Sequence, residues 1–321
     1  EEELKAALGL EFELVRRLGG GPLSTVYLAR EPALQRLVAV KALHPQAVRK
    51  PKALARFRRE AHSLARVSHP NVVSIHRVGD LSIAVPYLVM QYVHGRDLGQ
   101  RLREDGQLDV AEACNLIASI AAALIAVHSH GIVHRDLRPA SVLCEEPGGR
   151  VVLADFGLAT FLSDLEEGTE KLTTAGHVIT DLRFSSPELL RGEDATGASD
   201  TYALGVLAYY ALSAYGPYPG GSAHGQARAH LEREPLSLGA LGVDAPDGLE
   251  PLLRACLAKR AESRPTLADV IEEISRLRLS EGVGPIAAQQ PSEKDSSARP
   301  DATPTGASTA GYEMRLLGGL E

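Results

Sequence analysis

Residues 134–136, His-Arg-Asp, and residues 155–157, Asp-Phe-Gly, are the stretches that decide the fold of this chain. Each tripeptide alone is a weak signal, because short motifs recur by chance in unrelated sequences. A glycine-rich turn at residues 18–26 and an apolar strand that ends at Lys41 precede them. This order and spacing indicate one site that is assembled from distant parts of the sequence.

Composition sets the broad limits. The 321 residues are enough for one large domain or for two lobes with substantial cores. The net charge of −7 gives no general attraction to nucleic acid or to an anionic membrane, so no nucleic-acid partner is expected. Seven Lys or Arg between residues 49 and 66 fall on a predicted helix, which favours a solvated helix face.

The cysteines and the apolar runs bear on the cellular compartment. Cys114, Cys144 and Cys256 are far apart, odd in number and without a Cys-x-x-Cys pair, which favours reduced core thiols in the cytoplasm. The longest apolar run, residues 116–127, is shorter than the roughly 18 residues that span a bilayer. Because the sequence begins with Glu, we expect a fragment, and a membrane tether or sensor domain would lie outside it.

Apolar periodicity predicts a small β-rich lobe followed by a larger α-rich lobe. Residues 11–42 and 72–92 have the pattern of strands and tight turns, whereas residues 53–67 have the spacing of a helix. Asp109 is placed to cap a second helix. The apolar stretch at residues 202–214 predicts a helix buried inside the larger lobe.

These patterns give the expected domain boundaries. Residues 1–10 are expected to form an N-terminal extension and residues 11–279 the domain, with its two lobes at about 11–93 and 94–279. From residue 280 to residue 321 the composition shifts to Pro, Ser, Ala and charge without periodicity, which predicts a disordered linker or tail.

The glycine-rich turn and one carboxylate favour phosphate binding. The turn reads Leu-Gly-Gly-Gly-Pro-Leu-Ser-Thr-Val, and a plain glycine hairpin is the simpler interpretation of it alone. The lysine that ends the next strand changes this balance. Glu60 lies on the apolar face of helix 53–67, and a carboxylate buried there needs a cationic partner.

Together these motifs, from residue 12 to residue 277, resemble the eukaryotic-like (Hanks-type) serine/threonine protein kinases of bacteria. The resemblance implies an α+β, two-lobed protein kinase fold, with one long helix in the small β-rich lobe and a larger α-helical lobe. It also implies a transferase that moves the γ-phosphoryl of ATP, held with Mg²⁺ or Mn²⁺, to a hydroxyl of a protein substrate.

The resemblance gives each motif a role. Lys41, paired with Glu60, would hold the α- and β-phosphates, Asp136 would accept the proton of the substrate hydroxyl, and Asp155 would bind the metal ion. His134 would be a packed core histidine. The implied nucleotide-binding residues are Gly19, Gly20, Gly21, Ser24, Val26, Ala39, Lys41, Met90, Gln91, Val93, Leu143 and Asp155. Ordinary core packing is an equally good interpretation of the apolar members.

Arg135 precedes Asp136, an arrangement by which such kinases order an activation loop through a phosphorylated residue. Thr173 and Thr174 are the expected acceptors. We therefore expect regulation by phosphorylation of the activation loop.

Three further residues match structural positions of the family. Glu188, in the Ser-Pro-Glu of residues 186–188, would pair with Arg264 in the large lobe. Asp200 would brace the catalytic loop from the start of the buried helix. These matches favour the fold and say nothing about activity.

Three catalytic positions depart from the family pattern. Arg138 and Ser141 stand where the family has a lysine and a metal-binding asparagine, and Asp181 replaces a threonine that bonds the catalytic aspartate. Ser141 would be a shorter and weaker metal ligand, while Arg138 still offers a cation to the γ-phosphate. Because two carboxylates in contact raise one another's pKa, we expect Asp181 to form a salt bridge with Arg138 instead.

These departures leave functions of different classes open. One is an active kinase, and another is a pseudokinase, a nucleotide-responsive binding or scaffold module that signals by conformation. A small-molecule kinase of the same fold fits less well, because residues 186–188 and the activation segment resemble those of protein kinases. The sequence decides neither the substrate nor whether two kinase domains form a dimer.

Overall fold

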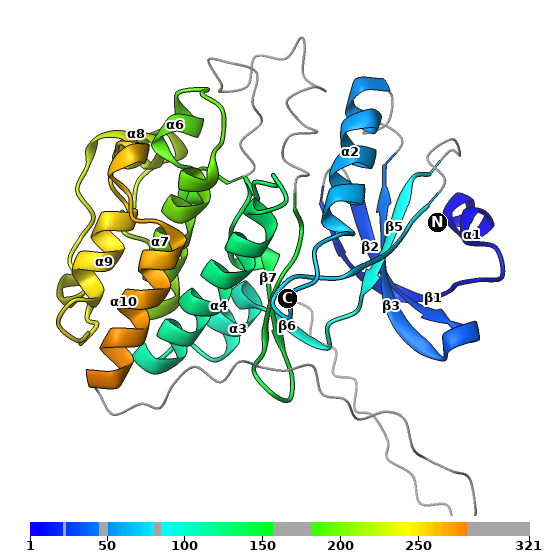
Figure 1. The fold of residues 1–321 in the computed structure, drawn as a ribbon, viewed down its shortest axis with the longest axis horizontal. Helices are drawn as coiled ribbons and strands as arrows, with labels where there is room; N and C mark the ends of the chain where they lie inside the picture. Colours follow the sequence, from blue (N-terminus) through cyan, green and yellow to red (C-terminus); the bar gives the residue numbers. More distant parts are fainter. Residues whose placement is uncertain (22–23, 45–50, 80–84, 157–180, 281–321) are drawn as a thin grey trace, which may run out of the picture. The chain divides into compact units, whose positions relative to one another are not determined.

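The computed structural model describes residues 1–21, 24–44, 51–79, 85–156 and 181–280, with the backbone alone for residues 51–57, 223 and 280. The small lobe is built on an antiparallel sheet with the strand order β1-β2-β3-β5-β4 (Figure 1). Its strands are β1 (Glu13–Gly20), β2 (Ser24–Glu31), β3 (Arg36–Leu43), β4 (Ile75–Val78) and β5 (Tyr87–Gln91). Its helical elements are α1 (Glu2–Leu8), the 3₁₀ turn η1 (Pro32–Leu34) and α2 (Pro51–Leu64).

The sheet of the small lobe has two apolar faces. Successive side chains of a strand point to opposite faces, and β3 shows this alternation. Val38 and Val40 are buried with Leu4 and Leu8 of α1 in one apolar cluster, whereas Ala39 belongs to a second cluster. The predicted extension, residues 1–10, thus packs against this sheet, and the limits of the domain stay a prediction. Leu4 and Leu8, four residues apart on one helix face, complete the core of the small lobe.

The large lobe contains a three-stranded sheet, in the order β6-β7-β8, and most of the described helices. Its strands are β6 (Gly95–Asp97), β7 (Val142–Glu145) and β8 (Val151–Leu153). Its helices are α3 (Leu98–Glu104), α4 (Val110–His128), α6 (Pro187–Leu190), α7 (Gly197–Ser213), α8 (Ala223–Glu232), α9 (Leu249–Cys256) and α10 (Leu267–Ser280). Its 3₁₀ turns are η3 (Pro139–Ser141), η4 (Leu182–Phe184), η5 (Gly239–Leu241) and η6 (Ala261–Ser263).

α4 and α7 form the centre of the large lobe. Asp109 caps α4 through its side chain, as predicted, and Leu124 of that helix is fully buried. α4 is long and apolar enough to cross a membrane, but most of its apolar residues belong to the core of this lobe, and such core helices pass the same test. α7 confirms the prediction of a buried helix, since Tyr202 and Leu207 are fully enclosed.

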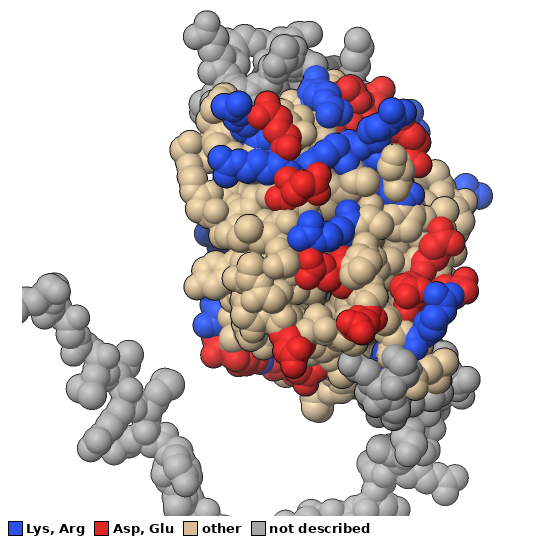
Figure 2. Space-filling model, turned by 90° about the vertical axis from the view of Figure 1, so that its left-hand side faces the viewer, with Lys and Arg blue, Asp and Glu red and all other residues tan. Residues whose placement is uncertain are grey.

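The distribution of surface charge and the burial of the cysteines agree with what the composition predicts. Figure 2 shows Lys and Arg interspersed with Asp and Glu on the face that carries α8, α9 and α10, so neither sign of charge dominates that face. Cys114, Cys144 and Cys256 are all buried and free, as predicted. The predicted tail lies outside the described residues, apart from the backbone of Ser280.

Candidate active site

A buried carboxylate on α7 holds the loop that carries Asp136. Asp200, 1% exposed, accepts hydrogen bonds from the backbone N–H groups of His134 and Arg135 at 2.8 and 2.9 Å. The His128 ring lies 2.7 Å from the same carboxylate. Asp200 therefore braces the catalytic loop as predicted. The contribution of His128 is not visible in the sequence, because a histidine in the last turn of a helix has no distinctive pattern.

His134 is the packed core histidine that the sequence predicts. It is fully buried, and its Nε2 lies 3.0 Å from the carbonyl oxygen of Ala154. Its Nδ1 accepts the backbone N–H of Asp136 at 3.3 Å, so the proton of a neutral ring lies on Nε2 and is donated to Ala154. The ring therefore connects the loop to the strand end before Asp155 and is not available as a base.

Two non-glycine residues of the site have left-handed backbone conformations. The φ angle is 68° at Arg135 and 64° at Asp155. Such conformations are unfavourable for L-residues and persist only where the surrounding structure holds them. Here the hydrogen bond from the Arg135 N–H to Asp200 supplies part of that support.

Lys41 on β3 contacts the large lobe. Its Nζ lies 2.7 Å from Oδ1 of Asp155, and its side chain is almost fully buried. Burial alone would raise the pKa of Asp155, but the Lys41 ammonium beside it more than offsets this and lowers that pKa. The ion pair thus joins a cation of the small lobe to an ionised carboxylate of the large lobe.

The predicted ion pair between Lys41 and Glu60 is wrong for this conformation. Both residues are described, and Lys41 binds Asp155 while Glu60 lies 3.4 Å from Nη1 of Arg135. The sequence indicates that Glu60 needs a cation, but it does not say which of two nearby cations binds it. Arg135 and Glu60 are partly exposed, and exposed pairs exchange partners at small energetic cost.

The predicted salt bridge between Arg138 and Asp181 is also wrong. Nε of Arg138 lies 3.2 Å from Oδ2 of Asp136, two residues away. Asp181 binds Arg183, also two residues away, through Nε and Nη2 at 2.9 and 2.6 Å. Each charge is thus paired within its own turn, which restricts the chain less than a pair between distant loops.

Ser141 closes the η3 turn. Its hydroxyl donates to the carbonyl oxygen of Arg138 at 2.8 Å and accepts the Arg138 N–H at 3.1 Å. The residue is 1% exposed. The hydroxyl proton and one lone pair are therefore already used, so any metal binding by Ser141 would compete with this brace.

Asp155 is the described residue best suited to a divalent ion. Its side chain is 33% exposed and its carboxylate is ionised. Mg²⁺ is commonly bound by one or two carboxylates together with phosphate oxygens and water. Within the described ranges, no three His, Cys, Asp or Glu side chains gather as a metal site of their own. The donor set thus fits an ion that shares its coordination with a nucleotide.

The apolar residues predicted to contact adenine gather in one cluster. They come from strands of both sheets, which only the folded chain brings together. The cluster contains Ala39, Val73, Met90, Val93, Val152 and Ala154, with Val26, Ile75, Leu143 and Phe156 packed against it. Gln91 ends β5 beside this cluster, and its N–H donates to the carbonyl oxygen of Ser74 at 2.8 Å. That these residues enclose a base stays a prediction.

The glycine-rich turn is a hairpin between β1 and β2. The N–H of Gly21 donates to the carbonyl oxygen of Ser24 at 2.9 Å. A Cβ atom on Gly20 would lie 2.7 Å from that same oxygen, so glycine is required there. Gly19 has open space around it, and residues 22 and 23 lie outside the described residues.

Glu188 and Arg264 form the buried pair that the sequence predicts. Two parallel hydrogen bonds of 2.7 Å join the guanidinium to the carboxylate, and Ser199 donates a third at 2.7 Å. Burial would raise the pKa of Glu188, but the bonds from Arg264 and Ser199 outweigh it and lower the pKa to about 2. This pair ties α6 to the segment before α10.

Gly157, Thr173 and Thr174 lie outside the described residues.

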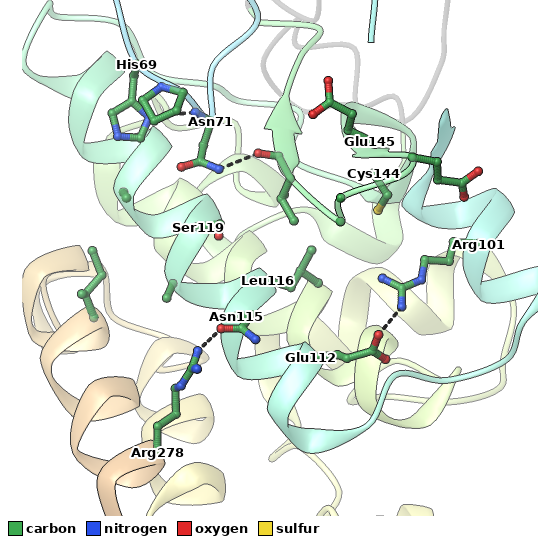
Figure 3. A pocket seen from close by; sticks show the side chains of 18 of the residues that line it. His69, Asn71, Arg101, Glu112, Asn115, Leu116, Ser119, Cys144, Glu145 and Arg278 are labelled. Carbon is green, nitrogen blue, oxygen red and sulfur yellow. Dashed lines mark hydrogen bonds and ion pairs between the residues drawn. The ribbon is translucent and has the colours of Figure 1, made fainter. Parts of the chain in front are cut away.

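A separate pocket of about 1090 Å³ lies on the large lobe between α4, α10 and the β7–β8 hairpin (Figure 3). Arg101 and Glu112 pair at 2.6 Å on one of its walls, and Arg278 contacts Asn115 on another. The catalytic and phosphate-binding candidates do not line it. The pocket is therefore distinct from the site that contains Asp155.

A two-lobed fold in which Lys41 meets Asp155 beside a braced Asp136 loop defines a protein kinase domain. The sequence matches the protein kinase domain family over residues 12–274, and the chain belongs to that family. The resemblance drawn from the motifs is confirmed in two ways. Its relatives include bacterial serine/threonine-protein kinases, and solved structures with a similar fold are kinase domains.

Two bacterial relatives illustrate the match. The probable serine/threonine-protein kinase PknB of Lactococcus lactis is 35% identical, over 84% of this chain and 42% of the relative. Serine/threonine-protein kinase PrkC of Bacillus subtilis is 34% identical, over 81% and 39%. This chain thus spans about two fifths of the length of those relatives. The PknI kinase domain of Mycobacterium tuberculosis has a TM-score of 0.63 at 27% identity, over 85% of this chain and 96% of that domain.

Proposed function

We propose that this chain is an ATP-dependent protein serine/threonine kinase. The observation that carries the proposal is the 2.7 Å contact between Lys41 and Asp155, which joins phosphate-binding and metal-binding candidates from two lobes. The apolar cluster around Ala39 and Met90 supports a base-binding site next to it. The names of the bacterial relatives support Ser or Thr of a protein as the acceptor.

The residues would divide the transfer among them. Asp136 orients the acceptor hydroxyl and takes its proton as the oxygen attacks the γ-phosphorus and the bond to the leaving ADP oxygen breaks. Lys41 and the N–H groups of the glycine turn, Gly19 to Gly21, bind the phosphates. A Mg²⁺ or Mn²⁺ ion at Asp155 would neutralise charge on the β- and γ-phosphates.

The contact between Arg135 and Glu60 suggests how the domain is regulated. In the described conformation Arg135 binds Glu60, so Glu60 does not position Lys41. A phosphate on Thr173 or Thr174 offers Arg135 a doubly charged partner with stronger hydrogen bonds. Glu60 is then released to pair with Lys41, which frees Asp155 for the metal ion.

The rival function is a pseudokinase that binds nucleotide and signals by conformation. Two observations favour it. The Ser141 hydroxyl is committed to the Arg138 backbone, and the Arg138 side chain rests 3.2 Å from the carboxylate of the proposed base, Asp136. Both features weaken transfer without removing the nucleotide site.

Incubation with γ-labelled ATP and Mg²⁺ or Mn²⁺ separates the two functions. We expect label on Ser or Thr with the wild-type chain and almost none with Asp136→Ala, while ATP with metal still raises the melting temperature of both. Label that is absent from the wild type, or unchanged by the substitution, would favour the pseudokinase.

We further propose a cytoplasmic setting, which the three buried free thiols support. Since the chain covers about two fifths of its relatives, a membrane tether or sensor domain would belong to sequence outside it. Pairing of kinase domains in a dimer stays a proposal to be tested by measuring the mass in solution.

A further inference from the structure

The pocket between α4, α10 and the β7–β8 hairpin has no part in the kinase chemistry described above (Figure 3). Its volume of about 1090 Å³ is at the upper end of the roughly 300–1,000 Å³ that is usual for ligand pockets. Leu116 of α4, Val151 of β8 and Ile271 of α10 give it an apolar lining. Leu279, in the last turn of α10, also lines it and is 68% exposed in the described part of the chain. The pocket thus offers apolar surface that a further group can cover.

The charged side chains around the pocket are paired with one another. Ion pairs of 2.6–2.8 Å join Arg101 to Glu112, Arg96 to Asp105, Arg96 to Glu146, and Arg150 to Glu145. Arg278 contacts the amide oxygen of Asn115. An uncharged occupant leaves these pairs intact, whereas a charged occupant has to compete for their partners and lose part of its hydration. The pocket therefore favours an uncharged occupant with apolar side chains.

The chain has a segment of this kind directly after α10. The backbone of α10 is described as far as Ser280, one residue beyond Leu279 at the rim of the pocket. Residues 282–289, which lie outside the described residues, have the sequence Gly-Val-Gly-Pro-Ile-Ala-Ala-Gln and carry no charge. Two glycines and a proline disfavour a continuation of the helix. An extended chain covers about 3.3 Å per residue, so the first six residues after Ser280 can reach about 20 Å from the end of α10.

We propose that residues 282–289 bind in this pocket, with Val283 and Ile286 against its apolar lining. The segment belongs to the folded large lobe, and the predicted tail begins after it. Because the catalytic and phosphate-binding candidates do not line the pocket, the segment fixes where the chain leaves the lobe without touching the nucleotide site. This contact goes beyond the kinase function and does not depend on it.

The absence of tryptophan from the sequence makes a direct test possible. Ile286→Trp in the full chain introduces a single indole, and quenching of its fluorescence by acrylamide measures its exposure. The reference is Ala302→Trp, a position in the tail beyond the proposed segment. We expect an about threefold lower quenching constant for Ile286→Trp, since tryptophan in a folded protein is mostly, though rarely fully, enclosed. In urea the two constants should become equal.

Two further substitutions show whether the indole lies in the pocket. Ser119→Arg fills it with a long charged side chain from α4, and Leu279→Glu places a charge at its rim. Ser119 is partly exposed and Leu279 is exposed, so neither change disturbs the core. Each of them, combined with Ile286→Trp, should raise the quenching constant to that of Ala302→Trp. The matched control is Ser129→Arg, at the exposed C-terminal end of the same helix, which should leave the constant low.

Equal quenching constants for Ile286→Trp and Ala302→Trp would overturn the proposal and leave the pocket to another occupant. A low constant that neither Ser119→Arg nor Leu279→Glu changes would place the indole elsewhere and would also overturn it. A constant that falls as the protein concentration rises would assign the pocket to the segment of a second copy and overturn binding within one chain. None of these measurements requires phosphoryl transfer, so a failure of the kinase function would not affect the result.

Discussion

The large lobe holds charged groups in two different ways. The scaffold has buried ion pairs, whereas the charged groups around the catalytic loop, called the front of the site, are partly exposed. In the scaffold the side chains of Arg264 and Glu188 are 0% and 7% exposed and share two hydrogen bonds. In front of the loop, the Arg138 side chain is 35% exposed, and its contact with Asp136 is single and longer. A buried charge cannot lose its partner without a large penalty, whereas an exposed one can exchange it. The scaffold is thus fixed, and the front is able to rearrange when nucleotide binds.

The largest effect is expected at the front, from Asp155→Asn. Loss of the carboxylate that we propose to bind the metal ion should lower phosphoryl transfer by about three orders of magnitude, since a bound metal ion contributes several kcal/mol of charge stabilisation. Initial rates with labelled ATP and Mg²⁺ measure this. Asp105→Asn, which weakens only an exposed pair with Arg96, serves as the control and should keep the wild-type rate. Equal transfer rates in the two variants would show that Asp155 has no role in phosphoryl transfer.

In the scaffold, Arg264→Met should lower the free energy of unfolding by about 3–5 kcal/mol, because it leaves the Glu188 carboxylate buried without its cation. Urea unfolding measures the change. The matched control is Arg260→Met, whose pair with Glu262 is exposed and should contribute less than about 1 kcal/mol. Similar losses for both variants would contradict the contrast between buried and exposed pairs.

Acid should weaken the scaffold through Glu188. Its pKa is about 2 in the folded chain against 4.5 for the free side chain, so the folded state favours the ionised form. The resulting stabilisation, on the order of 3 kcal/mol, is present above pH 4.5 and is lost as the pH falls towards 2. The free energy of unfolding of the wild type and of Glu188→Gln should be measured between pH 7 and pH 2. The difference between the two values should shrink as the pH falls from 4.5 towards 2. A difference that is constant with pH would show that the carboxylate does not titrate as described.

Glu60→Gln tests whether the front changes its pairs. After phosphorylation of the activation loop, this variant should transfer phosphate about tenfold more slowly than the wild type, because Lys41 loses a charged partner. Before phosphorylation the variant and the wild type should transfer phosphate at similar rates. The control is Glu104→Gln, at an exposed site in the large lobe. A loss of equal size in both states would mean that Glu60 acts without the proposed exchange.

The smallest effect is expected at Ser186. Its hydroxyl oxygen is buried and has no hydrogen-bond partner among the described residues. Ser186→Ala removes an unsatisfied polar group and should raise the free energy of unfolding by about 1 kcal/mol. Thermal or urea unfolding measures it, with Ser199→Ala, which removes a bond to Glu188, expected to change stability in the opposite direction. A destabilised Ser186→Ala would point to a partner for this hydroxyl.

The sequence predicts the fold and the fixed parts of the site well. The Glu188–Arg264 pair, the brace from Asp200 and the core position of His134 all involve buried polar groups, for which a partner is obligatory. The resemblance to the kinase family identified these residues, because each stands at a position that the family's motifs define. The predicted adenine contacts, such as Met90, do lie together, because strand alternation directs them to one face.

The sequence does not predict the pairing at the front. The structure pairs Glu60 with Arg135 and Arg138 with Asp136, and such partly exposed charges can exchange partners when other groups bind. The sequence predicts an extension for residues 1–10 but not its packing on the sheet through α1, because seven residues are a short signal.

A structure of the chain with a non-hydrolysable ATP analogue and Mg²⁺ tests the location and composition of the site most directly. We expect the metal ion on Asp155, the Lys41 ammonium on the phosphates instead of on that carboxylate, and the base against Ala39 and Met90. Nucleotide bound elsewhere, or a Lys41–Asp155 pair that persists beside it, would contradict the site as described.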